Sequence, residues 1–351
     1  MKTLCVLFGG VSSEHEVSCR SAASVLDNID RNKYKLATLG ITKGGRWLLY
    51  SGPTGLIPSG EWESSGMTVP AVISPDCGHG GLLVLEDKGA YSLKIDVFFG
   101  VLHGKNGEDG TVQGLMDLAG IPYVGSGVLS SAVCMDKAVA HALLTQAGIP
   151  KAKLVVVRRG EENDMAALEK KLAGALGYPM FVKPANSGSS VGVSRVTAPE
   201  GLPGALALAF GHDKKLVVER EIKGREIECS VIGNEEPLAA AVLGEIAPTA
   251  GFYDYDAKYN DDTAKLYIPA DLDDAVIQEI RGMAVRAYQV LCCEGFARVD
   301  FFLKEDGGII LNEINTIPGF TSISMFPKMF EAAGMPYGEL ISKMIDYAVN
   351  R

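Results

Sequence analysis

The chain has 351 residues, of which 47% are hydrophobic and 22% are charged, which is typical of a globular protein with two or three domains. Its formal net charge of −10 argues against non-specific binding to nucleic acid or to an anionic membrane, and no apolar run reaches the roughly 18–20 residues of a membrane span. Seven scattered cysteines without a C-x-x-C pair favour reduced thiols, so we expect a cytoplasmic protein that binds neither nucleic acid nor a membrane.

The first third of the sequence alternates short apolar runs with segments of helical periodicity. The apolar runs predict strands at residues 4–8, 36–41 and 96–102. The helical patterns predict helices at residues 14–29, 110–119 and 136–146. This β–α–β order is typical of a sheet whose strands are mostly parallel. Ser12 or Ser13 is expected to cap the first helix.

The rest of the chain has a different order of elements. Strands are predicted at residues 154–157, 180–183, 192–196, 216–221, 226–232 and 237–243, and helices at 165–176, 273–291 and from about 337. Residues 244–269 are polar and rich in tyrosine, and a loop of this length is usually a functional lid or disordered. We place domain boundaries near residues 125 and 220, which divides the chain into residues 1–125, 126–219 and 220–351.

A predicted β-hairpin at residues 296–314 carries the most informative polar residues. Asp306-Gly307 is a strong two-residue turn signal, and counting outward from it places Asp300 opposite Glu313. The same register places Arg298 opposite Asn315, and residues two apart on a strand share one face. Two directly opposed carboxylates repel each other, whereas Mg²⁺ would attract both and accept Asn315 as a third ligand.

Two alternatives remain open for this hairpin. Its charges could lie on an ordinary solvated face, although apolar residues such as Val299 and Ile314 alternate with them and indicate an organised one. A Gly307-Gly308 turn would instead shift the pairing by one residue. In the favoured register, Arg298 adds positive charge beside the metal for a phosphate or a developing oxyanion.

Four further segments have small or charged residues next to predicted strand ends. Residues 183–192 begin with a lysine and continue as a glycine- and serine-rich loop whose N–H groups could approach phosphate oxygens. Residues 219–226 could hold adenine and ribose. Residues 9–18 and 103–114 both follow strands of the expected parallel sheet, where ligands bind. Taken singly, the first three are also typical of ordinary loops, strand ends and helix starts.

Six motifs, in this order, resemble the D-alanine–D-alanine ligases of the ATP-grasp superfamily. They are Gly-Gly-x-Ser-x-Glu-x-Glu-Val-Ser at 9–18, His-Gly-x-x-Gly-Glu-Asp-Gly at 103–110, Gly-Ser-Gly at 125–127, Met-Asp-Lys at 135–137, and the segments 188–192 and 312–324. The resemblance implies an α/β protein with the ATP-grasp fold. In that fold an N-terminal Rossmann-like parallel-sheet domain precedes two α+β subdomains that clamp ATP.

The resemblance also implies ligands and residue roles. ATP, as co-substrate, would be bound by Lys137, Lys183, Ser190, Glu219, Arg220, Ile222, Glu226 and Lys258. Two Mg²⁺ ions, for which Mn²⁺ can substitute, would be bound by Asp300, Glu313 and Asn315. The first D-alanine would be held by Glu14 and His103, and the second by Ser324 and Met325. Arg298 and the N–H of Gly319 would stabilise the tetrahedral intermediate, and Glu14, Ser189 and Tyr259 resemble the family's hydrogen-bonded triad.

The implied function is ATP-dependent formation of D-alanyl-D-alanine for peptidoglycan synthesis. The leading alternative is a D-alanine–D-serine ligase of the glycopeptide-resistance type. Lys258-Tyr259 resembles the dipeptide-forming type rather than the depsipeptide-forming type, and Met325 favours an acceptor with a methyl group. Another ATP-grasp carboxylate–amine ligase and a non-catalytic nucleotide-binding protein are less favoured. The resemblance alone suggests a homodimer.

Overall fold

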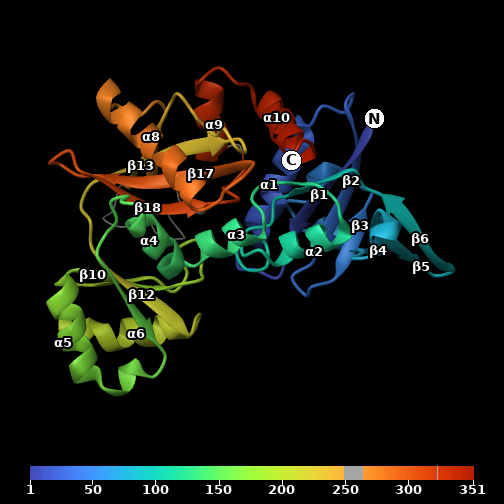
Figure 1. The fold of residues 1–351 in the computed structure, drawn as a ribbon. Helices are drawn as coiled ribbons and strands as arrows, with labels where there is room; N and C mark the ends of the chain where they lie inside the picture. The colour runs from blue at the N-terminus through green and yellow to red at the C-terminus, as the bar shows by residue number, and fades with distance from the viewer. Residues whose placement is uncertain (249–263, 322) are drawn as a thin grey trace.

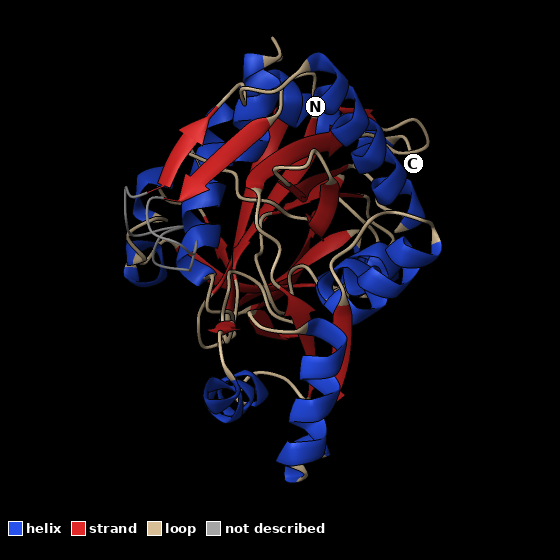
Figure 2. Cartoon of the chain, turned by 90° about the vertical axis from the view of Figure 1, so that its left-hand side faces the viewer, coloured by secondary structure: helices blue, strands red, loops and turns tan. Residues whose placement is uncertain are grey.

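The computed structural model describes residues 1–248, 264–321 and 323–351. In these residues the strands form three sheets, which follow one another along the chain (Figure 1). Seen from the side, the strands lie inside and most helices lie outside (Figure 2). The protein therefore has the α/β architecture expected from its sequence.

The first sheet has eight strands in the described residues. In spatial order they are β6 (Gly89–Lys94), β5 (Gly81–Glu86), β4 (Thr68–Ile73), β3 (Trp47–Tyr50), β2 (Tyr34–Ile41), β1 (Lys2–Gly9), β7 (Val97–Gly100) and β8 (Tyr123–Val124). β1 is parallel to β2 and β7, and β7 is parallel to β8, as expected. Strands β3 to β6 add an antiparallel extension that the β–α–β pattern did not predict.

Helices cover both faces of the first sheet, which explains why its central strand β1 is apolar throughout. One face of β1, with Val6 at its centre, packs against helix α1 (His15–Asn28). The other face, with Leu7, packs against helix α2 (Thr111–Ala119). The last helix, α10 (Tyr337–Val349), packs on the α1 face, so the end of the chain returns to the first sheet (Figure 1). The division at residues 125 and 220 therefore does not describe all of the packing, and it stays a prediction.

The start of α1 differs from the prediction. Glu14 is the N-cap residue and its side chain makes no capping hydrogen bond, so the prediction of a serine cap is wrong. Ser12 lies too early in the chain to reach the first helical turn, and its Oγ instead accepts a hydrogen bond of 3.1 Å from the Glu14 N–H. The carboxylate of Glu14 is thereby left for contacts outside the helix.

The second sheet consists, in the described part of the chain, of β11 (Ser194–Val196), β10 (Met180–Pro184), β12 (Lys215–Arg220) and β9 (Leu154–Arg158). Helices α5 (Met165–Leu176) and α6 (Leu202–Phe210) cover one face of it. Val182 and Val218 point into this helical layer. Because side chains alternate along a strand, Lys183 and Glu219 lie on the opposite, uncovered face.

The third sheet has the order β16 (Ala264–Tyr267), β15 (Gly244–Pro248), β13 (Arg225–Ile232), β17 (Phe296–Leu303) and β18 (Ile309–Asn315), with β14 (Leu238–Ala239) beside β13. Helices α4 (Lys137–Gln146) and α8 (Asp274–Val290) cover one face. The prediction of a continuous loop at 244–269 is wrong at both ends, because β15 and β16 pair with each other there. Lys258 and Tyr259 lie outside the described residues.

The remaining helices are α3 (Val128–Met135) and α9 (Met325–Ala332), with short 3₁₀ turns at Thr54–Leu56, Glu61–Ser64, Cys77–His79, Glu161–Asn163 and Pro199–Gly201. No single helix in the described ranges is long and apolar enough to cross a membrane. α3 and α4 meet that criterion only as a pair, and they are bent by 100° at their junction.

Candidate active site

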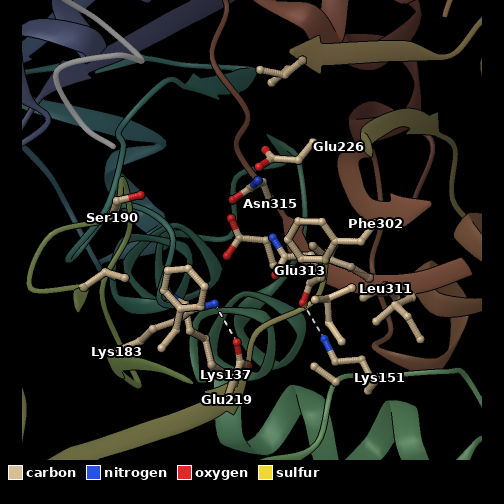
Figure 3. Close-up of a pocket in the computed structure, with 18 of the residues that line it drawn as sticks. Lys137, Lys151, Lys183, Ser190, Glu219, Glu226, Phe302, Leu311, Glu313 and Asn315 are labelled. Atoms are coloured by element: carbon tan, nitrogen blue, oxygen red, sulfur yellow. Dashed lines mark hydrogen bonds and ion pairs between the residues drawn. The ribbon is translucent and has the colours of Figure 1, made fainter. Parts of the chain in front are cut away.

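A cleft of about 710 Å³ is lined by the uncovered faces of the second and third sheets (Figure 3). Most of the predicted nucleotide and metal residues lie at it. They are Lys137, Lys183, Ser190, Glu219, Arg220, Ile222, Glu226, Glu313 and Asn315, and Ser189 of the predicted triad lies there too. Residues far apart in the sequence therefore meet around one space large enough for a nucleotide-sized ligand.

The hairpin of β17 and β18, called the acidic hairpin below, has the predicted pairing at its open end. Asp300 lies opposite Glu313, and Arg298 lies opposite Asn315. The predicted two-residue turn is wrong, however. Three residues, 305–307, connect Lys304 to Gly308, whose carbonyl accepts a 2.9 Å hydrogen bond from the Lys304 N–H. Gly307 has a φ of +82°, which a three-residue hairpin loop of this kind requires.

A β-bulge compensates for the longer turn. Phe301 lies opposite Leu311, whereas Asp300 lies opposite Glu313, so Asn312 is an extra residue on β18. The turn shifts the register by one residue and the bulge shifts it back. The predicted pairing of the two carboxylates is thus confirmed, although neither of the two features that produce it was predicted.

Arg298 is surrounded by carboxylates. Its guanidinium makes two hydrogen bonds to Asp300, of 2.8 and 2.7 Å, and its Nε lies 3.1 Å from the Glu228 Oε1. Burial opposes the charged form, but Asp300 and Glu228 outweigh it and raise the pKa of Arg298 well above its usual range. Glu228 was missed, although the alternation along residues 226–232 places it on the same face as Glu226.

The donor set at this position suits a hard divalent cation. Asp300 and Glu313 are direct neighbours across the ladder, and the Asn315 amide donates a 3.0 Å hydrogen bond to the Asp300 Oδ2. The candidate metal ligands are two carboxylates and one amide. No group of three histidine, cysteine or acidic side chains that could hold a metal is found within the described residues. Oxygen ligands of this kind match Mg²⁺, which usually completes its shell with water and substrate phosphates.

The opposite wall of the cleft carries lysines. The Lys183 Nζ lies 2.6 Å from the Glu219 Oε2 and 5.7 Å from the ring centre of Phe181. Burial by itself would lower the pKa of Lys183, but Glu219 outweighs it and raises that pKa. At the start of α4, the Lys137 Nζ donates a 2.5 Å hydrogen bond to the Ser187 carbonyl. These ammonium groups make this wall suitable for phosphate oxygens.

Lys151 is a third lysine at the cleft, and sequence analysis missed it. Its Nζ donates a hydrogen bond to the main-chain carbonyl of Asn312, at the bulge (Figure 3). Burial lowers the pKa of Lys151 to about 8, and the lysines nearby contribute to this shift. No motif marks this position, because the contact joins residues that are 161 positions apart.

The loop at residues 186–192, called the serine loop below, connects the cleft to the first sheet. Ser189 and Ser190 have φ angles of +47° and +59°, in the left-handed region that is unfavourable for residues with a Cβ. The Ser189 hydroxyl donates a hydrogen bond to Glu14. A Cβ on Gly188 would lie 3.0 Å from the Glu14 Oε2, so glycine allows this close approach.

His103 is buried between α1 and the segment after β18. The Ile317 carbonyl lies 3.0 Å from its Nδ1, and because a carbonyl can only accept, Nδ1 carries the proton. Its Nε2 lies 3.1 Å from the Ser21 hydroxyl. Burial lowers the pKa of His103, which favours the neutral ring. In this structure His103 therefore anchors the segment that contains Ile317.

Glu108 lines the cleft and was not singled out from the sequence. Its carboxylate accepts a 2.7 Å hydrogen bond from the Gly104 N–H. Burial, together with the nearby Glu14 and Glu313, raises the pKa of Glu108 well above its usual range. Glu14 and Glu108, which follow strands of the first sheet, and Glu313 of the third sheet are therefore close enough for their charges to interact. Only the tertiary structure reveals this proximity.

The predicted residues for the second substrate lie apart from the cleft lining. A Cβ on Gly319 would lie 2.7 Å from the Ser324 Oγ, so a side chain at this position would require the Ser324 hydroxyl to move. The Thr321 N–H donates a 3.0 Å hydrogen bond to the same oxygen. Met325, the first residue of α9, is buried in the hydrophobic core next to Gly244.

Comparisons with known proteins agree with this arrangement. Residues 3–126 match the family described as D-ala D-ala ligase N-terminus, and residues 143–346 match D-ala D-ala ligase C-terminus. D-alanine–D-alanine ligases from Thermoanaerobacter sp. (strain X514) and Acetivibrio thermocellus are 51% and 49% identical, over 99% and 100% of this chain and 96% of each relative.

Solved structures show the same fold. The VanG D-Ala:D-Ser ligase from Enterococcus faecalis is 42% identical, with a TM-score of 0.89 over 99% of both chains. The D-alanine–D-alanine ligase from Coxiella burnetii is 34% identical, with a TM-score of 0.86 over 100% of this chain and 96% of that one. These matches confirm the predicted ATP-grasp fold. The chain belongs to the D-alanine–D-alanine ligase family of ATP-dependent ligases.

Proposed function

We propose that this chain joins two D-alanine molecules at the expense of ATP, for peptidoglycan synthesis. The observation that carries the proposal is the cleft itself. One wall has the ammonium groups of Lys137 and Lys183, and the other has Glu313 and Asn315 of the acidic hairpin, with Asp300 and Arg298 beside them. Phosphoryl transfer depends mainly on positioning and on stabilising charge, and this arrangement supplies both.

The reaction has two steps. The carboxylate of the first D-alanine attacks the γ-phosphorus of ATP, and ADP leaves, which produces a D-alanyl phosphate. The amine of the second D-alanine then attacks the acyl carbon, phosphate leaves, and the amine loses a proton. Mg²⁺ bound by Asp300, Glu313 and Asn315 would neutralise charge on the phosphate oxygens. We assign Arg298 and the N–H of Gly319 to the oxyanion of the tetrahedral intermediate.

The nucleotide and the substrates have separate binding residues in this proposal. Lys137, Lys183, Ser190 and Lys258 bind phosphate oxygens, and Glu219, Arg220, Ile222 and Glu226 bind adenine and ribose. Glu14, positioned by its hydrogen bond from Ser189, holds the ammonium group of the first D-alanine, and His103 supports that end of the site. Ser324 and Met325 would bind the second D-alanine.

Water must be excluded, because an acyl phosphate hydrolyses readily. We propose that the segment between β15 and β16 closes the cleft, with Tyr259 joining Glu14 and Ser189. β15 supports this idea, since Glu245, Ile246 and Ala247 line the cleft. We also propose a cytoplasmic location and a homodimer. Sedimentation velocity of the purified protein tests the dimer.

D-Serine is the second candidate acceptor, and the likeness to the VanG D-Ala:D-Ser ligase is what favours it. An apolar pocket discriminates against one added hydroxyl by only about 100-fold. We propose D-alanine as the preferred acceptor because relatives named D-alanine–D-alanine ligase are more similar in sequence, at 51% against 42% identity.

The decisive experiment measures phosphate release from ATP with D-alanine and, in parallel, D-alanine plus D-serine or D-lactate. The dipeptide products are separated and identified by mass spectrometry. We expect ADP, phosphate and D-alanyl-D-alanine in equal amounts. Absence of D-alanine-dependent phosphate release would refute the proposed function, and a predominance of D-alanyl-D-serine would change the acceptor only.

A further inference from the structure

The bulge at Asn312 decides which residues of β18 face the cleft. Before the bulge, Ile309 and Leu311 point into the core beneath the third sheet. After it, Ile314 points into the same core. The extra residue therefore reverses the alternation, and Glu313 and Asn315 lie on the cleft face.

A regular strand would not produce this arrangement. If regular alternation continued from Leu311 through Asn312, Glu313 and Asn315 would follow Leu311 into the core against α8. Ile314 would then face the cleft in their place. The opposed pair of Asp300 and Glu313 thus depends on a local distortion of β18 as well as on the hairpin turn.

β18 is an edge strand, and a short segment after α4 covers it at the bulge. The Pro150 carbonyl accepts a 2.9 Å hydrogen bond from the Leu311 N–H, and Lys151 forms an isolated parallel bridge with Leu311. The Lys151 ammonium then donates to the carbonyl of Asn312, the extra residue itself. The two contacts fix the peptide units on either side of the bulge, which join residues 310 to 311 and 312 to 313.

We propose that Lys151 is a positioning residue for Glu313: it holds the Asn312 carbonyl and so maintains the bulge that presents Glu313 to the metal. The inference rests on the proposed function, in which Glu313 is a metal ligand. Lys151 acts through the main chain, so its loss should weaken metal binding more than nucleotide binding. Residues that orient metal ligands typically change metal affinity by about 10–100-fold when they are replaced.

The test replaces Lys151 with methionine, which keeps an unbranched apolar stem but removes the donor. The affinity of the enzyme–ADP complex for Mn²⁺ is measured by electron paramagnetic resonance of free Mn²⁺, which requires no catalysis. We expect it to fall about tenfold or more. We also expect the Mg²⁺ concentration for half-maximal phosphate release to rise by a similar factor, with a smaller change in kcat at saturating Mg²⁺.

Lys153→Met is the matched control. Lys153 lies two residues further on in the same segment and is exposed, so this variant removes the same charge without touching the bulge. We expect Mn²⁺ affinity within about twofold of the wild type. Lys151→Arg keeps a donor, and it should bind Mn²⁺ clearly more tightly than Lys151→Met. It also serves as the test variant if the methionine variant does not fold.

Three results would overturn the proposal. The first is an unchanged Mn²⁺ affinity in Lys151→Met, and the second is an equal loss of Mn²⁺ affinity in Lys153→Met. The third is a loss of ADP affinity in Lys151→Met that is as large without divalent metal as with it. The last result would mean that Lys151 binds the nucleotide directly. Because the Mn²⁺ measurement does not depend on D-alanine, it remains interpretable if the wild type proves inactive with that substrate, which would refute the proposed function instead.

Discussion

The acidic hairpin and the serine loop face the same cleft, but different interactions hold them. At the acidic hairpin, the charges of Arg298 and Asp300 and of Glu228 on the neighbouring strand β13 compensate one another, and main-chain ladders flank β17 on both sides. In the serine loop, Ser189 and Ser190 have left-handed φ angles, and the Ser189 hydroxyl reaches Glu14 next to the first sheet.

The acidic hairpin and the serine loop therefore depend on different parts of the molecule. The charged residues of the acidic hairpin pair with one another and with the neighbouring strand, so these pairs contribute to the stability of the third sheet. The serine loop depends on the distance between the first and second sheets. Substitutions in the hairpin should therefore affect both folding and catalysis, whereas substitutions in the loop should affect catalysis and substrate binding alone.

The largest effect is expected for Arg298→Ala. Removing this largely buried guanidinium takes away the cation that Asp300 and Glu228 share, and breaking a pair of this kind costs about 3–5 kcal/mol. Phosphate release should also be abolished. Urea denaturation of the variant measures the first expectation. Arg225→Ala removes a more exposed guanidinium that pairs with Glu245, and it should cost at most about 1 kcal/mol. Equal losses in the two variants would contradict the comparison.

Glu313→Ala should remove activity with a smaller loss of stability. The change relieves repulsion between Glu313 and Asp300 but deletes a proposed metal ligand, so we expect phosphate release to fall about 1000-fold or more, which corresponds to about 4 kcal/mol. Steady-state assays at several Mg²⁺ concentrations measure this. Glu305→Ala, in the exposed turn of the same hairpin, provides the control. Turnover close to that of the wild type in Glu313→Ala would refute the assigned role.

The ion pair on the opposite wall gives a pH-dependent prediction. Burial by itself would raise the pKa of Glu219, but Lys183, Lys151 and Lys137 together lower it. A carboxylate with a lowered pKa stabilises the folded state above its unfolded pKa, and this contribution disappears as the pH falls through the folded value.

We therefore expect Glu219→Gln to lower the free energy of unfolding by about 1–3 kcal/mol near neutral pH. The difference from the wild type should shrink as the pH falls below about 4. Urea denaturation over a pH series measures both values. A difference that stays constant or grows toward acidic pH would contradict this account of the pair.

The smallest change in stability is expected for Ser189→Ala. The variant removes the hydrogen bond to Glu14 but no sheet contact, so the free energy of unfolding should change by less than about 0.5 kcal/mol. The KM for D-alanine should rise about tenfold, since the lost bond holds the carboxylate proposed to bind its ammonium group. Ser187→Ala, in the same loop, is the control. A large decrease in the free energy of unfolding of Ser189→Ala would show that the serine loop contributes to stability as the acidic hairpin does.

Much of the fold could be predicted because the signals were local. Strand β1, helices α5 and α8 and the acidic hairpin all follow from periodicity and from glycine or proline at their ends. Strands β3 to β6 were missed because they pair in antiparallel order, with no crossover helices between them whose periodicity would mark the strands. Helices α6 and α9 were missed too. α6 is apolar almost all round, so it shows no clear helical period.

The residues of the candidate site also fall into those that local patterns predicted and those that they did not. Motifs and alternation indicated the pairing of Asp300 with Glu313, the phosphate-binding character of Lys183 and the serine loop. They did not indicate Glu228 or Lys151, whose importance comes from neighbours in other strands and sheets, and they placed Glu108 in a motif without assigning it a role. The predicted register is correct only because two differences cancel. The turn is one residue longer than predicted, and the bulge, which was not predicted, shifts the pairing back by one residue.

The sequence alone predicted many of the strands and helices, the family of the chain and the chemical character of each wall of the cleft. These properties depend on residue type and spacing over a few positions. Tertiary contacts alone establish that β18 carries a bulge, that Lys151 from the segment after α4 contacts it, and that the final helix packs on the first sheet. The last two depend on contacts between residues more than 100 positions apart, which short-range patterning does not encode.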